Sequence, residues 1–396
     1  MRVGIVTEWF SRGAAYVSQQ YRRALADQGV EVFIYARGDR DPRASDEWRD
    51  ERTHTAVACR VRRPKAIYAP DFERWLLRNK IDCVLFNEQH WMPPVLWARS
   101  LGVKTAAYVD YYTFETLASF EWYDLLICNT QRHKRAFQWH TAVQYIPWGT
   151  DVVRFKPVPR SERPLTFLHS AGWDPERKGT EQVLRAWSRL PGETNLVIHS
   201  QADISPLLRD PAIEKRLVSR ELVVLSGTMR PEELYQLGDV YVYPTHLEGI
   251  GLSVAEALAS GLPVIVPDDG PMDEFVSDPY SVKVPVAERW HRRDGYYWPC
   301  NSVADSDVTQ AMQSFASQSS GSVESWRRET RSVAMRRFNW HQNAADLASV
   351  ISNAPIRVPN KNVTSLATPV HARFGRAVSF AGRFTSLILG ERHVRQ

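Results

Sequence analysis

Cysteine is scarce in this chain of 396 residues, and the four that occur are far apart, with no CxxC pair among them: Cys59, Cys83, Cys128 and Cys300. Such spacing supports neither a disulfide framework nor a structural zinc site, and it favours a reducing compartment. The longest apolar stretches have the length of strands, and the run FTSLILG at 384–390 is too short to span a bilayer. The opening residues MRVGIVTEWF have the pattern of a buried strand and not of a signal peptide, so we expect a cytoplasmic protein.

Charge is nearly balanced, with 50 Lys and Arg residues against 45 Asp and Glu, but it is unevenly distributed. From Pro355 to the end, seven cationic residues and one Glu give a net charge of +6, which leaves −1 for the first 354 residues. A near-neutral body without a basic patch is a poor partner for nucleic acid. The charged fraction of 24% and the aromatic fraction of 11% are those of a folded protein with two or three domains.

Short apolar runs alternate with helical patterns along most of the chain. The first such series begins with RVGIVTE at 2–8 and VEVFIYA at 30–36, which flank a helical pattern. A second series starts with LTFLHSAG at 165–172, after a proline-rich linker at 146–164. Nearly all-apolar strands that are separated by helices indicate parallel sheets covered on both faces. The sequence therefore predicts an α/β fold with two Rossmann-like, doubly wound domains in tandem.

Two strand-to-helix turns place glycine beside cationic residues. In the first turn, Gly13 leads into a helix whose free amides face an anion, although an ordinary turn explains this glycine equally well. In the second turn, Gly172 ends a strand, and Arg177 and Lys178 come just before a helix. A diphosphate there would meet both cations and the positive end of the helix dipole. The alternative is a solvated charge pair at a helix start.

The segment YPTHLEGIGLSVAEALASG at 243–261 is the most specific feature of the chain. Glu248 lies in the turn after a strand, and Glu256 follows on a helix that begins near Leu252. The amides of Gly251, Leu252 and Ser253 form an anion cradle between the two carboxylates. A sugar joined through two phosphates to a ribose fits this order of groups. The alternative is that Glu248 caps the helix and Glu256 is exposed.

These motifs, with IPWGTDVVRFKP at 146–157, resemble the retaining GT-B glycosyltransferases of family 4 over most of residues 1–350. The resemblance implies that Glu256 holds the ribose hydroxyls of a nucleotide and that Lys178, with Arg177, neutralises its diphosphate. It also implies a wider set of donor contacts, namely Gly13, Gly172, Arg230, Glu248, Gly249, Ile250, Gly251, Leu252 and Ser253, with Arg230 bordering the nucleobase. Members of the family generally need no metal, so we expect a nucleotide-diphosphate sugar as substrate and no cofactor.

The domain limits expected from the linker and the resemblance are an acceptor-side domain at 1–155 and a donor domain at 156–340. A helix at 341–354 is expected to cross back onto the first domain, and a basic tail occupies 355–396. The tail pattern favours an amphipathic helix on an anionic membrane surface, while a flexible tail or an oligomer contact is an equal alternative. The aromatic stretch at 288–302 is expected to form a loop, in which Trp290, Tyr297 and Trp298 pack in the core or stack on a sugar.

Three positions depart from the family pattern. Trp173 stands where an arginine is common, Ala14 replaces the second glycine of the first turn, and Asp110 lies where many members have a histidine. His90 is another candidate for that histidine.

The predicted reaction is the transfer of a hexose-type sugar to a hydroxyl acceptor, such as a glycan or a lipid-linked molecule, with retention of anomeric configuration. Glu248 and Lys178 act at the donor, and Asp110 orients or deprotonates the acceptor. A GT-B-type sugar-nucleotide epimerase and a non-catalytic scaffold subunit with this fold are the alternatives. The nucleobase, the sugar, the acceptor and the oligomeric state are left open.

Overall fold

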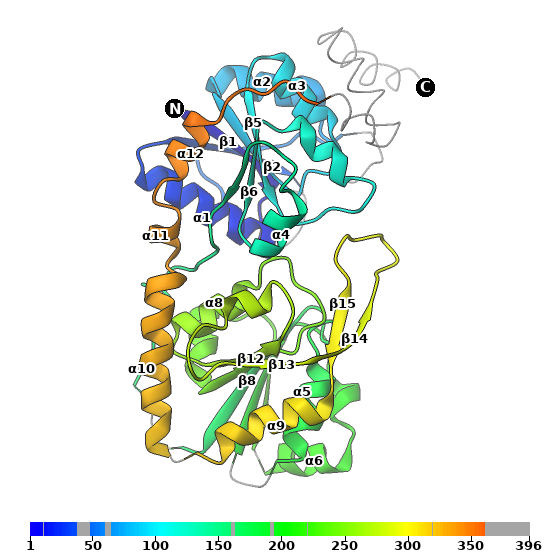
Figure 1. Cartoon of the computed structure of the whole chain (residues 1–396), viewed down its shortest axis with the longest axis vertical. Coiled ribbons are helices and arrows are strands. Elements are labelled where there is room, and N and C mark those ends of the chain that lie inside the picture. Colours follow the sequence, from blue (N-terminus) through cyan, green and yellow to red (C-terminus); the bar gives the residue numbers. More distant parts are fainter. Residues whose placement is uncertain are drawn as a thin grey trace. The chain divides into compact units, whose positions relative to one another are not determined.

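The computed structural model describes residues 1–10, 12–37, 48–59, 65–159, 163–190, 194–219, 221–318 and 320–360. The chain, drawn in Figure 1, divides into two compact units. The first unit comprises Met1–Ile146, Gly295–Tyr297 and the residues from Ala344 onward, and the second comprises Pro147–Asp294 and Trp298–Asn343. Of the predicted basic, partly amphipathic tail at 355–396, residues 355–360 are described and Arg357 forms an ion pair with Glu121 at 2.8 Å, while 361–396 lie outside the described residues. Among the described helices, none is both long enough and apolar enough to cross a membrane.

The first unit is built on a parallel sheet of seven strands in the order β3-β2-β1-β4-β5-β6-β7. The strands are β1 (Arg2–Glu8), β2 (Glu31–Arg37), β3 (Thr53–Thr55), β4 (Cys83–Asn87), β5 (Lys104–Val109), β6 (Leu125–Cys128) and β7 (Val143–Tyr145). The central strands are almost wholly buried, which is why their sequences are apolar without alternation. This outcome confirms the doubly wound fold that the sequence predicts.

Helices cover this sheet (Figure 1), and the last helix of the described chain joins them. They are α1 (Gly13–Asp27), α2 (Ala69–Asn79), α3 (Pro93–Ser100), the short η2 (Leu117–Trp122), α4 (Gln131–Ala136) and α12 (Leu347–Asn353). The Gln28 side chain at the end of α1 donates to the Ala344 carbonyl at 2.8 Å and accepts from the Ala348 amide at 2.9 Å. The C-terminal helix therefore returns to the first unit, as predicted.

The second unit has a parallel sheet of six strands in the order β10-β9-β8-β11-β12-β13. These are β8 (Leu165–Gly172), β9 (Thr194–Ser200), β10 (Leu222–Ser226), β11 (Val240–Val242), β12 (Val264–Pro267) and β13 (Val282–Val284). Its helices are α5 (Thr180–Ser188), η3 (Ser205–Leu208), α6 (Pro211–Val218), α7 (Pro231–Leu234), η4 (Tyr235–Leu237), α8 (Leu252–Ala259), η5 (Met272–Phe275), α9 (Asp305–Ala316), α10 (Ser320–Arg337) and α11 (Trp340–Asn343). A buried apolar cluster around Trp187 and Phe167 forms the core.

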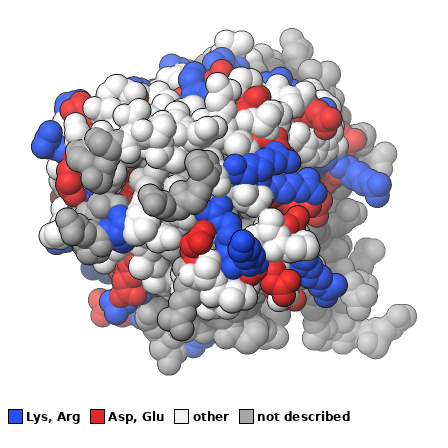
Figure 2. All heavy atoms as spheres, turned by 90° about the horizontal axis from the view of Figure 1, so that it is seen from below, with Lys and Arg blue, Asp and Glu red and all other residues white. Residues whose placement is uncertain are grey.

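The face of the second unit seen in Figure 2 carries positive and negative side chains next to one another. Among the ion pairs of α5 and α6 are Arg185 with Glu181 and Arg216 with Glu221. Charges of both signs are thus interspersed on this face.

The boundary between the units falls earlier than the predicted residue 155. Residues 147–155 bind to the second unit, because the Thr150 amide donates to the Phe338 carbonyl at 2.7 Å and the Arg331 guanidinium bonds the carbonyls of Val152 and Phe155. The aromatic stretch at 288–302 is also not a loop throughout, since β14 (Val286–Trp290) and β15 (Cys300–Val303) form an antiparallel pair.

In each sheet, a buried aspartate links the amino ends of two neighbouring strands. Asp124 comes directly before β6 and accepts from the Thr105 amide, at the start of the neighbouring strand β5, at 2.9 Å. Asp239 comes directly before β11 and accepts from the Thr166 amide, at the start of β8, at 3.0 Å. Both side chains are 0% exposed, and each forms an ion pair with an arginine. The same device thus fixes neighbouring strands in both units.

Replacing Asp124 by Ala is expected to lower the free energy of unfolding of the first unit by about 3–5 kcal/mol, because Arg99 would be left in a largely buried site without its carboxylate. Asp82 offers a matched control, since it precedes β4 and bonds the Arg2 amide at 2.7 Å in an exposed position. Asp82→Ala is expected to cost about 1 kcal/mol or less. Urea unfolding followed by circular dichroism measures both, and equal losses would contradict the assignment.

Candidate active site

The carboxyl ends of β8 and β11, which are neighbours in the second sheet, carry the two motifs that the sequence singles out. After β8 the chain turns at Gly172, with φ +58°, and reaches Gly179, with φ +70°, at the start of α5. A side chain at Gly179 would collide with the Pro244 carbonyl, which lies 2.4 Å from the position of its Cβ. The His246 amide donates to the Arg177 carbonyl at 2.8 Å. Segments 172–179 and 243–251 therefore lie side by side.

Glu248 is the centre of this site. Its Oε1 forms ion pairs with Lys178 Nζ and with Arg177 Nη1, the latter at 2.9 Å. The same oxygen accepts from the hydroxyls of Tyr243 and Thr245, each at 2.9 Å. Burial by itself would raise the pKa of Glu248, but Lys178 and Arg177 outweigh it and lower that pKa to about 2. Glu248 is thus an anion throughout the physiological pH range.

Lys178 and Arg177 share this carboxylate as their common partner. The Lys178 ammonium also contacts the Tyr243 hydroxyl, and burial lowers the pKa of Lys178 although Glu248 opposes the shift. The Arg177 guanidinium also donates to the Leu247 carbonyl at 2.6 Å. The two cations and Glu248 therefore form one ion-pair network in the free protein. An anionic ligand at Lys178 would share this cation with Glu248.

Glu256 lies in a different electrostatic environment, although it belongs to the same motif. It sits on α8, and its Oε2 accepts from the Tyr235 hydroxyl at 2.8 Å. Burial raises the pKa of Glu256 to about 7, and the Tyr235 hydrogen bond only partly offsets it. Within the described part of the chain no cation forms an ion pair with it. A ligand hydroxyl is the kind of group that this carboxyl is free to bind.

The start of α8 completes the site. Gly251, with φ +88°, is the N-cap, and no side chain caps the helix there. A Cβ on Gly251 would lie 2.4 Å from the terminal methyl of Met272, which explains the glycine. Leu252 and Ser253 form the first turn, whose amides are available to an anion. Ile250 is 5% exposed and packs in the interior, so of this residue only the backbone faces the loop.

The remaining residues singled out in the sequence lie at the border of this site or in the first unit. Arg230, at the N-terminus of α7, is 75% exposed and pairs with Glu233 at 3.0 Å. Its segment leads directly to Tyr235 and so adjoins Glu256. Trp173, at the position where family 4 commonly has an arginine, is 63% exposed beside this site. Gly13 begins α1 in the first unit, and Asp110 follows β5 there.

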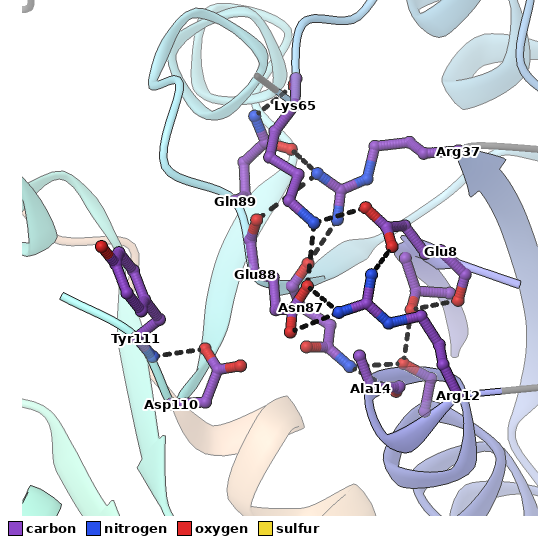
Figure 3. Close-up of polar contacts among 12 residues, drawn as sticks. Glu8, Arg12, Ala14, Arg37, Lys65, Asn87, Glu88, Gln89, Asp110 and Tyr111 are labelled. Atoms are coloured by element: carbon purple, nitrogen blue, oxygen red, sulfur yellow. Dashed lines mark hydrogen bonds and ion pairs between the residues drawn. The ribbon is translucent and has the colours of Figure 1, made fainter. Parts of the chain in front are cut away.

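A second charged site, which the sequence analysis missed, occupies the carboxyl edge of the first sheet (Figure 3). Lys65 Nζ lies 2.5 Å from Glu8 and 2.8 Å from Glu88, and Arg12 contacts the same two carboxylates. We name Glu8, Arg12, Lys65 and Glu88 the Glu88 cluster. Two cations and two anions thus alternate in it.

Asp110 lies beside the Glu88 cluster and accepts from the Tyr111 amide at 2.7 Å. Burial and the negative charge of Glu88 raise the pKa of Asp110 well above the ordinary value of an aspartate. Burial lowers the pKa of His90 to about 4, so this imidazole is neutral at physiological pH. Burial opposes ionisation of Glu88 as well, but Lys65 and Arg12 lower its pKa, so two carboxyls with opposite pKa shifts lie next to each other.

Several residues of the two sites carry no signal in the sequence. Tyr235 and Tyr243 look like ordinary apolar residues of a helix and a strand, and their hydroxyls matter only because the fold brings them to Glu256 and Glu248. Lys65 is an isolated lysine in a loop. Glu8 and Glu88 do follow the pattern of polar residues at strand ends, which was available as a hint. Within the described residues no group of three or more His, Cys, Asp or Glu side chains is placed to bind a metal ion.

Comparison with known proteins addresses both the family and the fold. Residues 154–285 match the family model described as Glycosyl transferases group 1. The D-inositol 3-phosphate glycosyltransferase of Xylanimonas cellulosilytica is 26% identical over 236 residues, which make up 55% of this chain and 52% of that protein. The chain thus matches about half the length of this curated relative.

Solved structures extend the likeness over both units. Sucrose-phosphate synthase of Thermosynechococcus elongatus has a TM-score of 0.67 at 16% identity and covers 89% of this chain and 98% of its own. HepE of Anabaena, solved in complex with UDP and glucose, has a TM-score of 0.65 at 13% identity and covers 89% and 99%. At such identities the likeness shows the fold alone. Residues 154–285 thus carry the likeness to the glycosyl transferases group 1 family, and the two Rossmann-like units have the GT-B fold.

Proposed function

We propose that the protein transfers a hexose-type sugar from a nucleotide-diphosphate sugar to a hydroxyl acceptor with retention of anomeric configuration. The observation that carries this proposal is the pairing of Glu248 with Lys178 and Arg177 beside the uncapped start of α8. The family match over 154–285 and the UDP complex of HepE support a nucleotide sugar as the donor.

In this proposal Glu256 accepts the ribose hydroxyls of the donor. Its carboxyl is buried and lacks an ion-pair partner in the described structure, so a hydroxyl donor would stabilise its ionised form. Lys178, Arg177 and the α8 amides face the diphosphate, while Glu248 accepts hydroxyls of the sugar. The nucleobase would lie near Arg230.

Charge builds on the diphosphate as the glycosidic bond breaks, and Lys178 is the group that would stabilise it most. Its ammonium is held by Glu248 and Tyr243, so no reorganisation is needed when that charge develops. In a front-face reaction the departing phosphate itself takes the acceptor proton. We propose that Asp110, whose pKa is raised by burial and by Glu88, orients or deprotonates the acceptor hydroxyl. No metal ion or other cofactor is part of the proposal.

The acceptor is a glycan or a lipid-linked molecule in polysaccharide biosynthesis, and the protein acts in the cytoplasm. The basic segment at 361–396 would hold it at the inner face of an anionic membrane. That segment lies outside the described residues, so this part of the proposal rests on its sequence.

Lys178→Ala is expected to lower donor turnover about 10²–10³-fold, because the leaving diphosphate loses its strongest partner. A thermal-shift screen with UDP-, GDP-, ADP- and TDP-sugars first selects the donor, and NMR then follows turnover and the anomeric configuration of the product. Lys283→Ala is the matched control, since Lys283 is an exposed lysine of the same unit that pairs with Asp268 at 3.0 Å. Turnover of Lys178→Ala at the wild-type rate would contradict the proposal. A nucleotide sugar altered in its sugar would instead indicate an epimerase, and an inverted product would refute retention.

Glu256→Gln is expected to stabilise the second unit at neutral pH while weakening nucleotide binding. The pKa of Glu256, raised by burial to about 7 from an ordinary 4.5, means that the unfolded chain loses this proton first as the pH rises. The carboxyl therefore destabilises the fold increasingly between those two values, and by a constant amount of about 3 kcal/mol above them. Gln keeps an acceptor for Tyr235 and removes the titration.

Urea unfolding at about pH 5 and about pH 8 tests this expectation. The stability gain of Glu256→Gln over the wild type grows with pH and then levels off. Glu288→Gln, at an exposed position of the same unit, serves as the control and shows no such gain. A gain that is independent of pH would show that Glu256 ionises normally.

A further inference from the structure

We propose that the Glu88 cluster, with Asp110 and Tyr111, binds the acceptor and that the acceptor group recognised here is an uncharged sugar or polyol. Phosphorylated and carboxylated acceptors are excluded by the same site. The inference rests on the proposed function, because it names the chemical class of the acceptor in that reaction.

The charges of the four cluster residues compensate one another, and the neighbouring buried Arg37 guanidinium is bound to the Asn87 carbonyl at 2.5 Å and to Gln89 Oε1 at 2.9 Å. Each of the cluster's cations contacts both carboxylates, and the side chains of Lys65, Glu8 and Glu88 are only 17%, 17% and 18% exposed. A phosphate or carboxylate on the ligand would have to displace Glu8 or Glu88 from its cations. That exchange would leave a largely buried carboxylate unpaired, which is strongly unfavourable. The cluster therefore disfavours an anionic ligand.

Hydroxyl groups can bind without breaking these ion pairs. A carboxylate offers about four lone-pair positions, and a hydroxyl both donates and accepts a hydrogen bond. Asn87 adds a further acceptor, because its Nδ2 is held by the Ala14 carbonyl at 2.8 Å while its buried Oδ1 has no hydrogen-bond partner in the described structure. Figure 3 places Asn87 between the cluster and Asp110. A ligand hydroxyl would supply the missing donor.

The backbone holds two members of the cluster in an unfavourable conformation. Lys65 has φ +62° and Glu88 has φ +52°, in the left-handed region that favours glycine. Glycine at either position would relieve the strain but remove the charged group. Strain of this kind persists where it positions functional side chains, and here the two strained residues pair directly with each other.

An aromatic surface adjoins the charged groups. The Tyr111 ring stacks on Tyr296 with centroids 5.1 Å apart and meets His90 edge-on at 4.9 Å. Figure 3 shows Tyr111 on one side of Asp110 and the Glu88 cluster on the other. A sugar ring presents both hydroxyl edges and an apolar face of C–H groups, so carboxylates beside an aromatic ring match both parts of it.

Saturation-transfer NMR with the full-length chain tests the inference. The probes are methyl α- and β-hexosides and myo-inositol, each compared with hexose 6-phosphates and hexuronates. We expect the uncharged probes to bind about tenfold or more tightly than the acidic ones. Glu88→Gln is expected to weaken the uncharged probes about tenfold, since one neutral hydrogen bond replaces a charged one. Glu31→Gln is the matched control, because Glu31 forms an exposed ion pair with Arg2 in the same unit and should bind like the wild type.

Nucleotide-sugar binding, measured on the same samples, distinguishes a failure of this inference from a failure of the proposed function. If the nucleotide sugar is turned over, any of three results shows that the inference is wrong. These are no binding of the uncharged probes, tighter binding of the acidic probes, and wild-type binding of the uncharged probes by Glu88→Gln. If no nucleotide sugar binds, the proposed function fails whatever the probes do. Should Glu88→Gln not fold, Asp110→Ala supplies the second variant, with the same expected loss for uncharged probes and with wild-type nucleotide binding.

Discussion

Compensation of buried carboxylates is the constraint on which this structure depends. A carboxylate taken out of water must be met by cations or by hydrogen-bond donors, or else it binds a proton. Asp124 and Asp239 are met by an arginine and by strand amides, and they fix the amino ends of the two sheets. Among the described residues, Glu256 accepts a hydrogen bond from the Tyr235 hydroxyl and forms no ion pair, and burial raises its pKa. Compensation by cations thus separates Glu248, whose pKa is lowered, from Glu256, whose pKa is raised by burial.

The two sites repeat one electrostatic arrangement in units of unrelated sequence. In the second unit Glu248 has two cations, Lys178 and Arg177, and in the first unit Glu88 has Lys65 and Arg12. Each unit also holds a carboxyl that forms no ion pair with a cation of the described residues, Glu256 in one case and Asp110 in the other. Both sites stand at the carboxyl ends of parallel strands, where successive turns converge and charged side chains from distant segments meet. The donor site adds the amides of α8, which suit a diphosphate, whereas the acceptor site adds an aromatic face.

Local sequence patterns pointed to the proposed donor site because its parts are short and self-contained. Gly172, Gly179 and Gly251 all have positive φ, so the motif glycines reflect backbone geometry that other residues adopt with strain. The Glu88 cluster escaped prediction for the opposite reason. Two of its ion pairs join residues 57 and 76 positions apart, and no periodicity or spacing links such residues before the sheet is assembled. The boundary after Ile146 was not predicted either. It depends on hydrogen bonds from Arg331 to the carbonyls of Val152 and Phe155, which lie far from Arg331 along the chain.

The sequence by itself determined the two doubly wound units and the motifs at 172–179 and 243–261, since apolar runs, glycines and carboxylates at fixed spacing are local properties. Tertiary structure alone decided the ionisation of each carboxyl. Glu248 and Glu256 belong to one motif, yet Lys178 and Arg177 lower the pKa of the first to about 2 against its burial, and burial raises that of the second to about 7. The difference arises because ionisation depends on the charges and on the solvent that surround a group in space, and neighbours in space are set by the fold.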